Sequence, residues 1–391
     1  MSKNDKLKID YNPDISDLGH LIWVHNFTIA SNNEFRAPFI VHDDNNYYGD
    51  LQTRYKKFFN IAKSAKADLE SLKIINKYTS KVLEALRLNY KGRISSSQNV
   101  IENLVKGCLN NSFAVDTAYS SDAFPGVKSI EPQFFHARRG TPRSYKAREM
   151  LHLPYRLRSK TGNYRFSIPG VPSYYLGNSS YCCWLEIGMP PEHEFNVSPV
   201  LVDGTQKIFN LAVSVKDHHC LKEYNSTTVH TWIKLLILMI ASSYRVAGEE
   251  NEDRNFRSEY VIPQYIMLAC KNQGLDGVAY FSNQVEYQDF AWSAINVALF
   301  AAEERFGNTY SDMCKHIKVG DAFNYFMFQQ LGRTNRDSGF DLRWTRTGMI
   351  NNIGNYDHQY GYAFTDFCEF DKFLFKNWKY DEIEYGNALM T

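Results

Sequence analysis

The sequence has no excess of charge of either sign and no long apolar run. Among its 391 residues, 44 Lys and Arg balance 43 Asp and Glu, which leaves a net charge of +1 at pH 7. A chain this close to neutral has no overall field that draws it to nucleic acid, so we predict no nucleic-acid partner. The longest apolar run, Leu235 to Ala241, is far shorter than the ~20 residues of a membrane-spanning helix. We therefore interpret it as part of a buried helix and expect no membrane partner.

The cysteines are scattered along the chain, which argues against two further classes of protein. The number of cysteines is odd and none form a C-x-x-C pair, so neither a disulfide framework nor a Cys-rich zinc site is expected. Residues 217–220 (DHHC) have the residue types of metal ligands, but no second cluster has a matching spacing, and we predict no metal. The N-terminal stretch MSKNDKLKID is polar and has no signal-peptide core, so we expect a cytoplasmic protein. The cysteines are Cys108, Cys182, Cys183, Cys220, Cys270, Cys314 and Cys368.

Glycine-rich phosphate loops are also absent, both of the Walker type and of the dinucleotide-binding type. Aromatic residues, in contrast, are abundant: 26 Tyr, 26 Phe and 6 Trp make up 15% of the chain. Such an excess suits a thick aromatic core, or surfaces that stack on the rings of a ligand. Composition alone does not separate these two interpretations.

The texture of the sequence changes along the chain and predicts three parts. Residues 1–125 form a helical domain, because apolar residues recur at three- and four-residue steps from about Leu51 to about Gly107. The segment 119–132 (YSSDAFPGVKSIEP) is the predicted linker. Residues 133–330 mix short strands with unequal helices, which indicates an α+β domain with a mixed sheet. Residues 331–391 show little periodicity, and we expect an irregular extension anchored by aromatic side chains.

Within the first two parts the pattern also places individual elements. The stretch KGRISSS, residues 91–97, breaks one helix of the N-terminal domain, and a second helix runs from about Gln98 to Leu109. The predicted strands and helices of the α+β domain are listed together here. Strands are expected at 133–137, 174–176, 207–215 and 276–281, and helices at about 179–188, 226–247 and 258–273.

One segment, residues 164–186 (YRFSIPGVPSYYLGNSSYCCWLE), is informative without any family in mind. Its prolines and Gly170 predict a turn, after which a short strand carries Tyr175. Ser179 or Ser180 can then cap a helix. On that helix Glu186 shares a face with Ser179 and Cys183, at i, i+4 and i+7. A carboxylate in such apolar company needs a partner or a function, and Arg138 and Arg165 are the candidate partners.

Four pieces in chain order resemble the RES family, which is named after its Arg, Glu and Ser. The pieces are FFHARRG at 134–140, MLHLPYRLR at 150–158, the segment 164–186, and EYVIPQ at 259–264 followed by DGVAYFS at 276–282. The family pattern has F-R-x-R, H-x-P, R-F-S-x-P-G-x-P-x-x-Y-L, a helix that ends in Glu, and Y-x-x-P-Q before D-G-x-x-Y-x-S. The matching residues are His152, Pro154, Arg165, Phe166, Ser167, Pro169, Gly170, Pro172, Tyr175, Leu176, Glu186, Tyr260, Pro263, Gln264, Asp276, Gly277, Tyr280 and Ser282.

The first strand departs from this pattern. Where the family has two alternating arginines, the chain reads His136-Ala137-Arg138. Side chains two apart on a strand share a face, so His136 and Arg138 should point into one cleft. If the essential arginine is the earlier one, His136 has replaced it, and Arg138 or Arg139 would have to serve instead.

The resemblance implies an ADP-ribosyltransferase-like fold with NAD⁺ as substrate. Arginine suits a pyrophosphate, and Arg138 is the first choice for it, before Arg165. Tyr175 would stack on the cationic nicotinamide. Glu186 would stabilise the oxocarbenium-like centre, and Ser282 would donate to a phosphate or to the carboxamide. The predicted catalytic residues are Glu186, Arg138 and Ser282, and the predicted NAD⁺-binding residues are Arg138, Arg165, Tyr175, His136, Ser282 and Gln264.

The function that the resemblance implies is that of a bacterial toxin or defence effector that depletes NAD⁺, by hydrolysis or phosphorolysis. Two alternatives are transfer of ADP-ribose to a macromolecule, and a degenerate module that senses NAD⁺. A toxin implies a neutralising antitoxin partner. The helix at 226–247 is expected in the core, with a homodimer contact as the alternative. Arg36 and His42 have the spacing of a ribonuclease motif, but Pro38 between them disfavours one helix, and we predict no ribonuclease.

Overall fold

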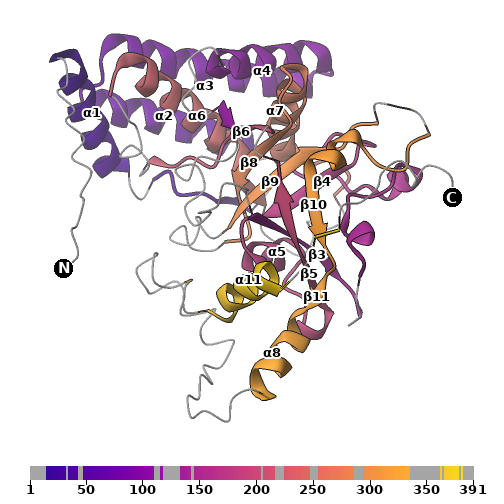
Figure 1. Ribbon diagram of the computed structural model, residues 1–391. Coiled ribbons are helices and arrows are strands. Elements are labelled where there is room, and N and C mark those ends of the chain that lie inside the picture. The colour runs from indigo at the N-terminus through magenta and orange to yellow at the C-terminus, as the bar shows by residue number, and fades with distance from the viewer. Residues whose placement is uncertain are drawn as a thin grey trace, which may run out of the picture.

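The structure is a computed structural model, and its fold class is α+β, as the sequence predicts. The helices before residue 110, together with two helices from the middle of the chain, lie at one end of the molecule, and the sheet and the remaining helices make up the rest (Figure 1). The structure describes residues 15–31, 34–42, 47–109, 115–117, 133–141, 145–203, 206–215, 224–246, 254–285, 294–303, 305, 307–334, 362, 365–377 and 380–381. The predicted linker at 119–132 and the DHHC stretch at 217–220 lie outside these residues.

Four helices build the N-terminal layer: α1 (Ile15–Ser31), α2 (Tyr47–Ser64), α3 (Leu69–Tyr90) and α4 (Ile94–Leu109). Asp68 begins α3, because its carboxylate accepts a hydrogen bond of 2.9 Å from the Ser71 amide. The predicted break between two helices is confirmed at residues 91–93, where Gly92 has a φ of +72° that favours glycine, but the second helix begins at Ile94 and not at about Gln98.

Helix α1 was not predicted. Its apolar residues surround the helix: Trp23 and Phe27 are buried, whereas Leu18, Ile22 and Ile29 are exposed. A helix with apolar residues on both sides has no single apolar face and therefore gives no clear 3.6-residue signal.

Ten strands in the described part of the chain form one mixed sheet. Their order is β12-β10-β5-β3-β4-β9-β8-β6-β2, and β11 also pairs with β5. Strands β6 and β8 are parallel, and the other pairs are antiparallel. The strands are β2 (Val115–Thr117), β3 (Gln133–Arg139), β4 (Ser173–Gly177), β5 (Phe195–Val202), β6 (Lys207–Asn210), β8 (Gly277–Phe281), β9 (Ile295–Phe300), β10 (Ile317–Gly320), β11 (Phe323–Asn324) and β12 (Tyr380–Asp381).

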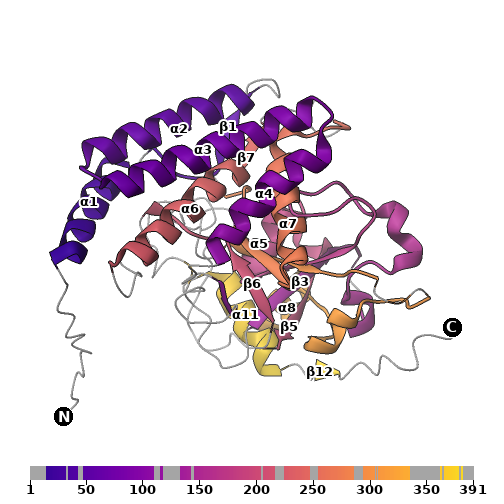
Figure 2. The same cartoon turned by 90° about the horizontal axis from the view of Figure 1, so that it is seen from above.

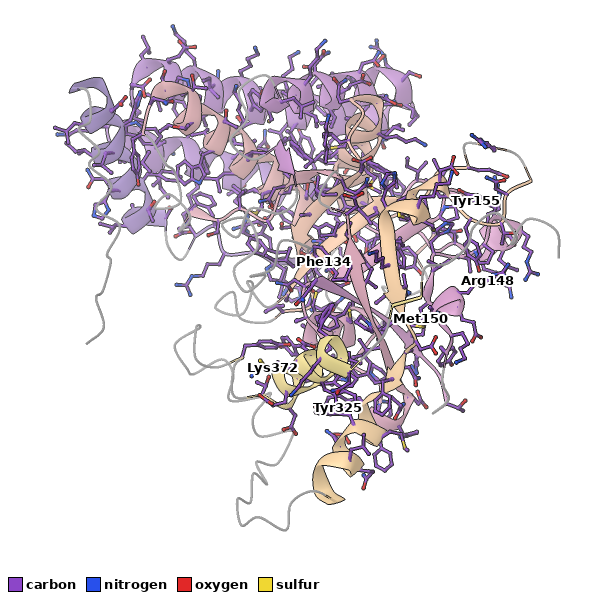
Figure 3. The ribbon with its side chains drawn as sticks, in the orientation of Figure 1. Phe134, Arg148, Met150, Tyr155, Tyr325 and Lys372 are labelled. Carbon is purple, nitrogen blue, oxygen red and sulfur yellow. The ribbon has the colours of Figure 1, made fainter. Side chains whose placement is uncertain are left out.

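Both faces of the sheet are covered, and this explains the continuous apolar runs in its central strands. In β8, Val278 and Tyr280 belong to the cluster under the helices, whereas Ala279 and Phe281 belong to a second cluster on the opposite face. Phe134 of β3, labelled in Figure 3, is fully buried in that second cluster.

One predicted strand is shorter than expected. The pattern predicts a strand over 207–215, but β6 ends at Asn210. There the Asn210 side chain accepts a hydrogen bond of 2.8 Å from the Ala212 amide, a local turn that competes with the sheet ladder.

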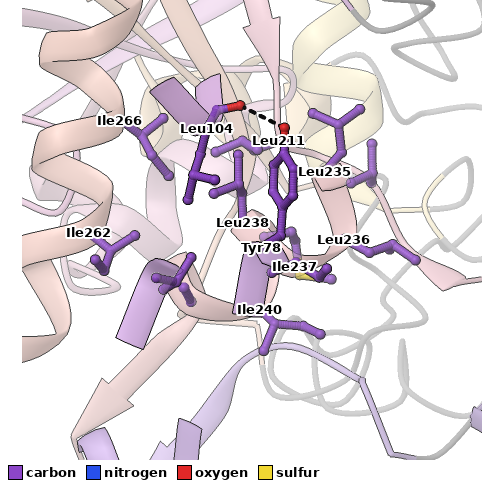
Figure 4. Close-up of a cluster of buried hydrophobic side chains, with 14 of the residues drawn as sticks. Tyr78, Leu104, Leu211, Leu235, Leu236, Ile237, Leu238, Ile240, Ile262 and Ile266 are labelled. Carbon is purple, nitrogen blue, oxygen red and sulfur yellow. Dashed lines mark hydrogen bonds between the residues drawn. The ribbon is translucent and has the colours of Figure 1, made fainter. Parts of the chain in front are cut away.

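Two helices from the middle of the chain, α6 (Ser226–Ser242) and α7 (Val261–Asn272), share one hydrophobic cluster with α1–α4. Every residue of α6 from Thr231 to Ser242 is buried, and Figure 4 shows its leucines and isoleucines packed around Tyr78 of α3. Seen from above, α6 lies along α2 and α3, and α7 lies beside α4 (Figure 2). The N-terminal helices therefore have no core separate from that of the later segment, and this stretch of α6 has no face left for a dimer contact.

Hydrogen bonds also join the N-terminal layer to the rest of the chain. The hydroxyls of Tyr47 and Tyr55 each donate to a backbone carbonyl of α6 over 2.8 Å. Strand β1 (Phe39–Val41) pairs in parallel with β7 (Tyr244–Val246). Arg54 of α2 donates to the Tyr244 hydroxyl over 3.0 Å and lies 4.2 Å from the centre of the Phe39 ring. The expectation of no single helix across Pro38 is confirmed, because β1 begins directly after it.

Part of the predicted C-terminal extension is helical. Helix α8 (Tyr325–Thr334) follows β11, and α11 (Asp366–Asn377) packs against the short helix α5 (Ser180–Glu186). The expected irregular extension is therefore wrong for 366–377, where Phe367, Phe370 and Leu374 are buried. Three buried apolar residues make too short a pattern to predict a helix from the sequence alone. Their anchoring role fits the expected aromatic contacts, since Phe367 stacks on Tyr325.

In the described part of the chain, no helix is both long enough and apolar enough to cross a membrane.

Candidate functional site

A pocket of about 720 Å³ opens between the sheet, α5 and β7. This volume lies in the range of about 300–1,000 Å³ that small-molecule sites occupy. Its walls are formed by β3, β4, β9 and α5, by the segment 160–165, by β7, and by residues 254–260 before α7. The pocket therefore joins segments that lie far apart in the sequence, and most of the RES-like pieces contribute to it.

Helix α5 supplies the carboxylate of the pocket. Its N-cap is Ser179, whose side chain accepts a hydrogen bond of 3.0 Å from the Cys182 amide, as the sequence predicts. Cys182, Cys183 and Leu185 are buried, which fixes the rotation of the helix against the sheet. Glu186 is the last residue of α5 and lines the pocket.

The carboxylate of Glu186 is held by two neutral donors on a single oxygen. Its Oε1 accepts a hydrogen bond of 2.5 Å from the Ser282 hydroxyl and one of 2.7 Å from the Asn296 side-chain amide. The expected pairing with Arg138 or Arg165 is wrong. The Glu186 side chain is exposed to solvent at the pocket, so no cation is needed to offset its burial. Among the described residues, no hydrogen bond is made to Oε2, the oxygen left for a ligand.

Asn296 was missed by the sequence analysis. It lies on β9 directly opposite Tyr280 of β8, is only 4% exposed, and its side-chain oxygen accepts from the Cys182 thiol at 3.2 Å. This contact orients the amide so that its NH₂ group faces Glu186. A signal was present: Asn296 is the one polar residue in the strand INVALF, and a polar side chain buried in such a run needs a partner.

Ser282 has a different role from the predicted one. Its hydroxyl donates a hydrogen bond to Glu186, and its oxygen accepts a hydrogen bond of 3.1 Å from the Gln284 amide. Ser282 is buried behind Glu186 and does not line the pocket. In this arrangement the proton is used by Glu186, so the donation to a phosphate or a carboxamide stays a prediction that this hydrogen bond does not favour.

His136 lines the pocket as a neutral ring that keeps one hydrogen-bond acceptor. Its Nδ1 lies 2.9 Å from the backbone oxygen of Tyr175. A carbonyl oxygen only accepts, so Nδ1 carries the proton and Nε2 keeps its lone pair. Burial, together with the nearby Arg138 and His152, lowers the pKa of His136 to about 4. Where the RES pattern has a permanent cation, this chain thus places an uncharged ring.

The two arginines of β3 separate. Arg138 lines the pocket and donates a hydrogen bond of 3.3 Å to the backbone oxygen of Leu151. This bond uses one of the five N–H groups of the guanidinium. Arg139 is exposed and pairs with Glu194 at 2.6 Å, and it does not line the pocket. Of these two, only Arg138 stands where a ligand would meet it.

Arg165 is a structural residue as well as a wall of the pocket. It is 8% exposed, and its guanidinium donates to the carbonyls of Ser242 and Phe281 at 3.3 and 2.6 Å. It also lies 4.4 Å from the centre of the Tyr280 ring. These contacts tie the end of α6 to the end of β8, so Arg165 has fewer N–H groups for a phosphate than the sequence suggested.

Tyr175 lines the pocket beside Tyr164, with ring centres 5.5 Å apart in an edge-to-face arrangement. Its hydroxyl donates 2.7 Å to the Phe166 carbonyl, and burial raises the pKa of Tyr175 above its usual value. Gln264 does not line the pocket. Its amide donates to Asn163 and to the Tyr164 carbonyl at 2.6 and 3.0 Å, so it supports the wall from behind.

Additional cations line the pocket that the sequence analysis did not select: Lys160, Arg245, Arg254 and Arg257. With Arg138 and Arg165 they face two carboxylates, those of Glu186 and Glu259. Arg254 pairs with the buried Glu259 at 2.7 Å. Their positions in separate, irregular segments gave no pattern in the sequence, and only the fold collects them.

No group of three His, Cys, Asp or Glu residues that could hold a metal ion occurs in the part of the chain that the structure describes.

Comparison with known proteins relates the chain to a relative named as a toxin. The chain is 30% identical over 171 residues to "Putative toxin YopC" of Bacillus subtilis (strain 168). The match covers 41% of this chain and 38% of that relative, so the chain spans less than two fifths of the relative's length. No family model matches the chain, and no solved structure matches it.

Proposed function

We propose that this protein is a RES-type enzyme that cleaves the bond between nicotinamide and ribose in NAD⁺. The observation that carries the proposal is the carboxylate of Glu186, fixed through one oxygen by Ser282 and Asn296 at a pocket rich in arginine and tyrosine. Such a carboxylate is the group that glycosidic cleavage requires, because positive charge develops on the sugar as the leaving group departs.

Glu186 would act on the ribose. Its Oε2 accepts no hydrogen bond from the described residues, and this oxygen would stabilise the oxocarbenium-like centre or orient a ribose hydroxyl. In hydrolysis, a water oxygen forms a bond to the anomeric carbon while the bond to the nicotinamide nitrogen breaks. Nicotinamide leaves as a neutral ring, and the proton of the water passes to solvent. In phosphorolysis, a phosphate oxygen replaces the water.

The cations would hold the pyrophosphate. Among the described residues, six Lys and Arg side chains line the pocket against two carboxylates, an excess of basic groups in a chain that is nearly neutral as a whole. Arg138 leads this set, because most of its N–H groups are not used by the Leu151 carbonyl. Arg245 and Arg257 enter the set from β7 and from the segment before α7.

Aromatic rings and His136 would hold the remaining groups. Tyr164 and Tyr175 stand together in the wall, and a cationic nicotinamide is attracted to their faces. The lone pair on Nε2 of His136 accepts a hydrogen bond, so it suits a carboxamide N–H or a ribose hydroxyl. With His136 in place of an arginine, this position would recognise a hydrogen-bond donor instead of a negatively charged group.

The test is release of nicotinamide from NAD⁺ by the purified chain, with and without inorganic phosphate. Glu186→Gln keeps the size of the side chain and removes its charge, and we expect it to lower the rate at least about 100-fold. Glu84→Gln, on α3 outside the pocket, is the matched control and should keep the wild-type rate. No release under any condition, or equal rates for Glu186→Gln and wild type, would refute the proposal.

The same samples separate the alternative functions. Transfer of label from NAD⁺ to a macromolecule in a bacterial lysate would identify an ADP-ribosyltransferase. Binding of NAD⁺ in calorimetry without any turnover would identify a sensor, an outcome consistent with the neutral His136.

We further propose that the protein acts as a toxin and is neutralised by a protein antitoxin, a proposal supported by its similarity to a relative named as a toxin. Expression in bacteria should stop growth and lower cellular NAD⁺, whereas Glu186→Gln should permit growth at the same protein level. Growth arrest that persists with Glu186→Gln would separate toxicity from the pocket.

A further inference from the structure

The C-terminal helix α11 is docked on the helix that carries Glu186. Asp371 of α11 accepts a hydrogen bond of 3.1 Å from the Ser180 amide, the first residue of α5. The hydroxyl of Tyr362 donates to the other carboxylate oxygen of Asp371. Figure 3 marks this helix by Lys372, the exposed neighbour of Asp371.

Apolar contacts fix the same two helices along their sides. The ring of Phe367 lies 5.4 Å from that of Tyr181 and 5.7 Å from that of Trp184. Phe367 is 3% exposed, and its carbonyl accepts from the Ser180 hydroxyl at 3.5 Å. Helix α11 therefore holds both the start and one side of α5.

Helix α5 needs this support because it is short. It has seven residues, about two turns, and a helix of that length is unstable without contacts. Its first amides have no partner within the helix. Ser179 satisfies the amide of Cys182 and Asp371 satisfies that of Ser180, while the negative charge of Asp371 is favoured at this end of the helix. Glu186 lies about 9 Å further along the axis, at 1.5 Å per residue.

We propose that Asp371 is a positioning residue for Glu186: by anchoring the first amide of α5 from the C-terminal helix, it sets the position of the carboxylate at the other end. The role of Glu186 in this statement rests on the proposed function. The anchoring itself depends only on the contacts between α11 and α5.

The anchor responds to pH. Burial raises the pKa of Asp371 to about 7. Among the described residues, the titratable groups that interact with it are Tyr362, Cys183 of α5 and Cys368 of its own helix, and burial raises the pKa of each of these above its usual value. When Asp371 is ionised, both of its oxygens accept hydrogen bonds. Protonation turns one oxygen into a donor and removes the charge at the helix start, so the hydrogen bond from the Ser180 amide is stronger above pH 7, even though the buried charge lowers the stability of the fold as a whole.

The experiment uses three variants of the full chain and two measurements. Asp371→Asn keeps the size and an acceptor but not the charge, Asp371→Leu removes the anchor, and Lys372→Ala is the control on the exposed face of α11. The first measurement is nicotinamide release between pH 5.5 and 8.5, analysed as kcat and KM. The second is hydrogen exchange of the α5 amides, normalised for the effect of pH on intrinsic exchange.

In wild type and Lys372→Ala, kcat should rise through about pH 7. Asp371→Asn should hold the low-pH value throughout, and Asp371→Leu should lose about tenfold in kcat at pH 8 with KM changed less than about twofold. Protection of the α5 amides should fall about tenfold in Asp371→Leu. A pH inflection kept by Asp371→Asn, or wild-type kcat in Asp371→Leu, would overturn the proposal.

If wild type releases no nicotinamide, the proposed function fails and the exchange data decide the anchoring alone. Unchanged protection of α5 in Asp371→Leu then refutes it, and lost protection supports it. If Asp371→Leu does not fold, the nearly isosteric Asp371→Asn decides, by whether the pH dependence of α5 protection disappears.

Discussion

Asn296 offers a direct test of the carboxylate arrangement, because its two contacts can be changed separately. Its NH₂ group donates 2.7 Å to Glu186, and its oxygen accepts 3.2 Å from the Cys182 thiol. Asn296→Asp changes one group only: it keeps the acceptor for Cys182 and replaces the donor to Glu186 with a second carboxylate oxygen. Asn296→Leu removes both contacts at similar volume.

The expected magnitude follows from the kind of bond. A hydrogen bond to a charged group contributes about 1.5–3 kcal/mol, and 1.36 kcal/mol changes a rate tenfold. Loss of the Asn296 donor should therefore lower kcat/KM for nicotinamide release by about 10- to 150-fold in Asn296→Leu. Asn296→Asp should lose more, because two carboxylates in contact repel each other, although this variant keeps the bond to Cys182.

The assay is nicotinamide release by wild type, both variants, Ser282→Ala and the double variant Asn296→Leu/Ser282→Ala. Both donors bond to the same Oε1, so the two losses should not add independently. Thermal unfolding of each variant shows whether a loss of rate reflects a loss of fold. The reasoning fails if Asn296→Asp is as active as wild type, or if Asn296→Leu is the more damaging of the two while both are equally stable.

Further predictions concern stability and binding. The pKa of Asp371 is about 7 in the folded chain and 3.8 ordinarily, so its contribution to stability is full below about pH 4 and is lost as pH rises through 7. The loss is at most about 4 kcal/mol, because the side chain keeps some contact with solvent. Urea unfolding at pH 4 and 8 should show this loss of stability in wild type and not in Asp371→Asn, and the same pH dependence in both proteins would contradict the prediction. His136→Gln, which keeps an acceptor, should hold the Kd for NAD⁺ within about threefold in calorimetry, whereas His136→Leu should weaken it about tenfold; equal affinities would refute the acceptor role. Arg165→Met should lower the free energy of unfolding by about 2–4 kcal/mol, since it leaves the Ser242 and Phe281 carbonyls without this donor, whereas a residue that only binds phosphate would lose affinity at unchanged stability.

Much of the local structure could be predicted from the sequence, because neighbours along the chain decide it. Ser179 caps α5 through an amide three residues away, and Pro263 stands in the first turn of α7. The apolar run in α6 indicates a buried helix whatever surrounds it. The exceptions have local reasons as well: α1 has no single apolar face, and Asn210 ends β6 with a turn of its own.

The tertiary structure alone decided what each polar group contacts. Asn296 meets Glu186 across 110 positions of sequence because β9 pairs with β8 in the register that sets Asn296 opposite Tyr280. A shift of one residue would turn Asn296 to the other face of the sheet, and no local pattern states that register. The local pattern of the sequence was enough to predict a capped helix, over about 179–188, that carries a carboxylate on one face. Only the fold decided that Ser282 and Asn296 hold it, and that Asp371, 191 positions beyond Ser180, anchors its helix.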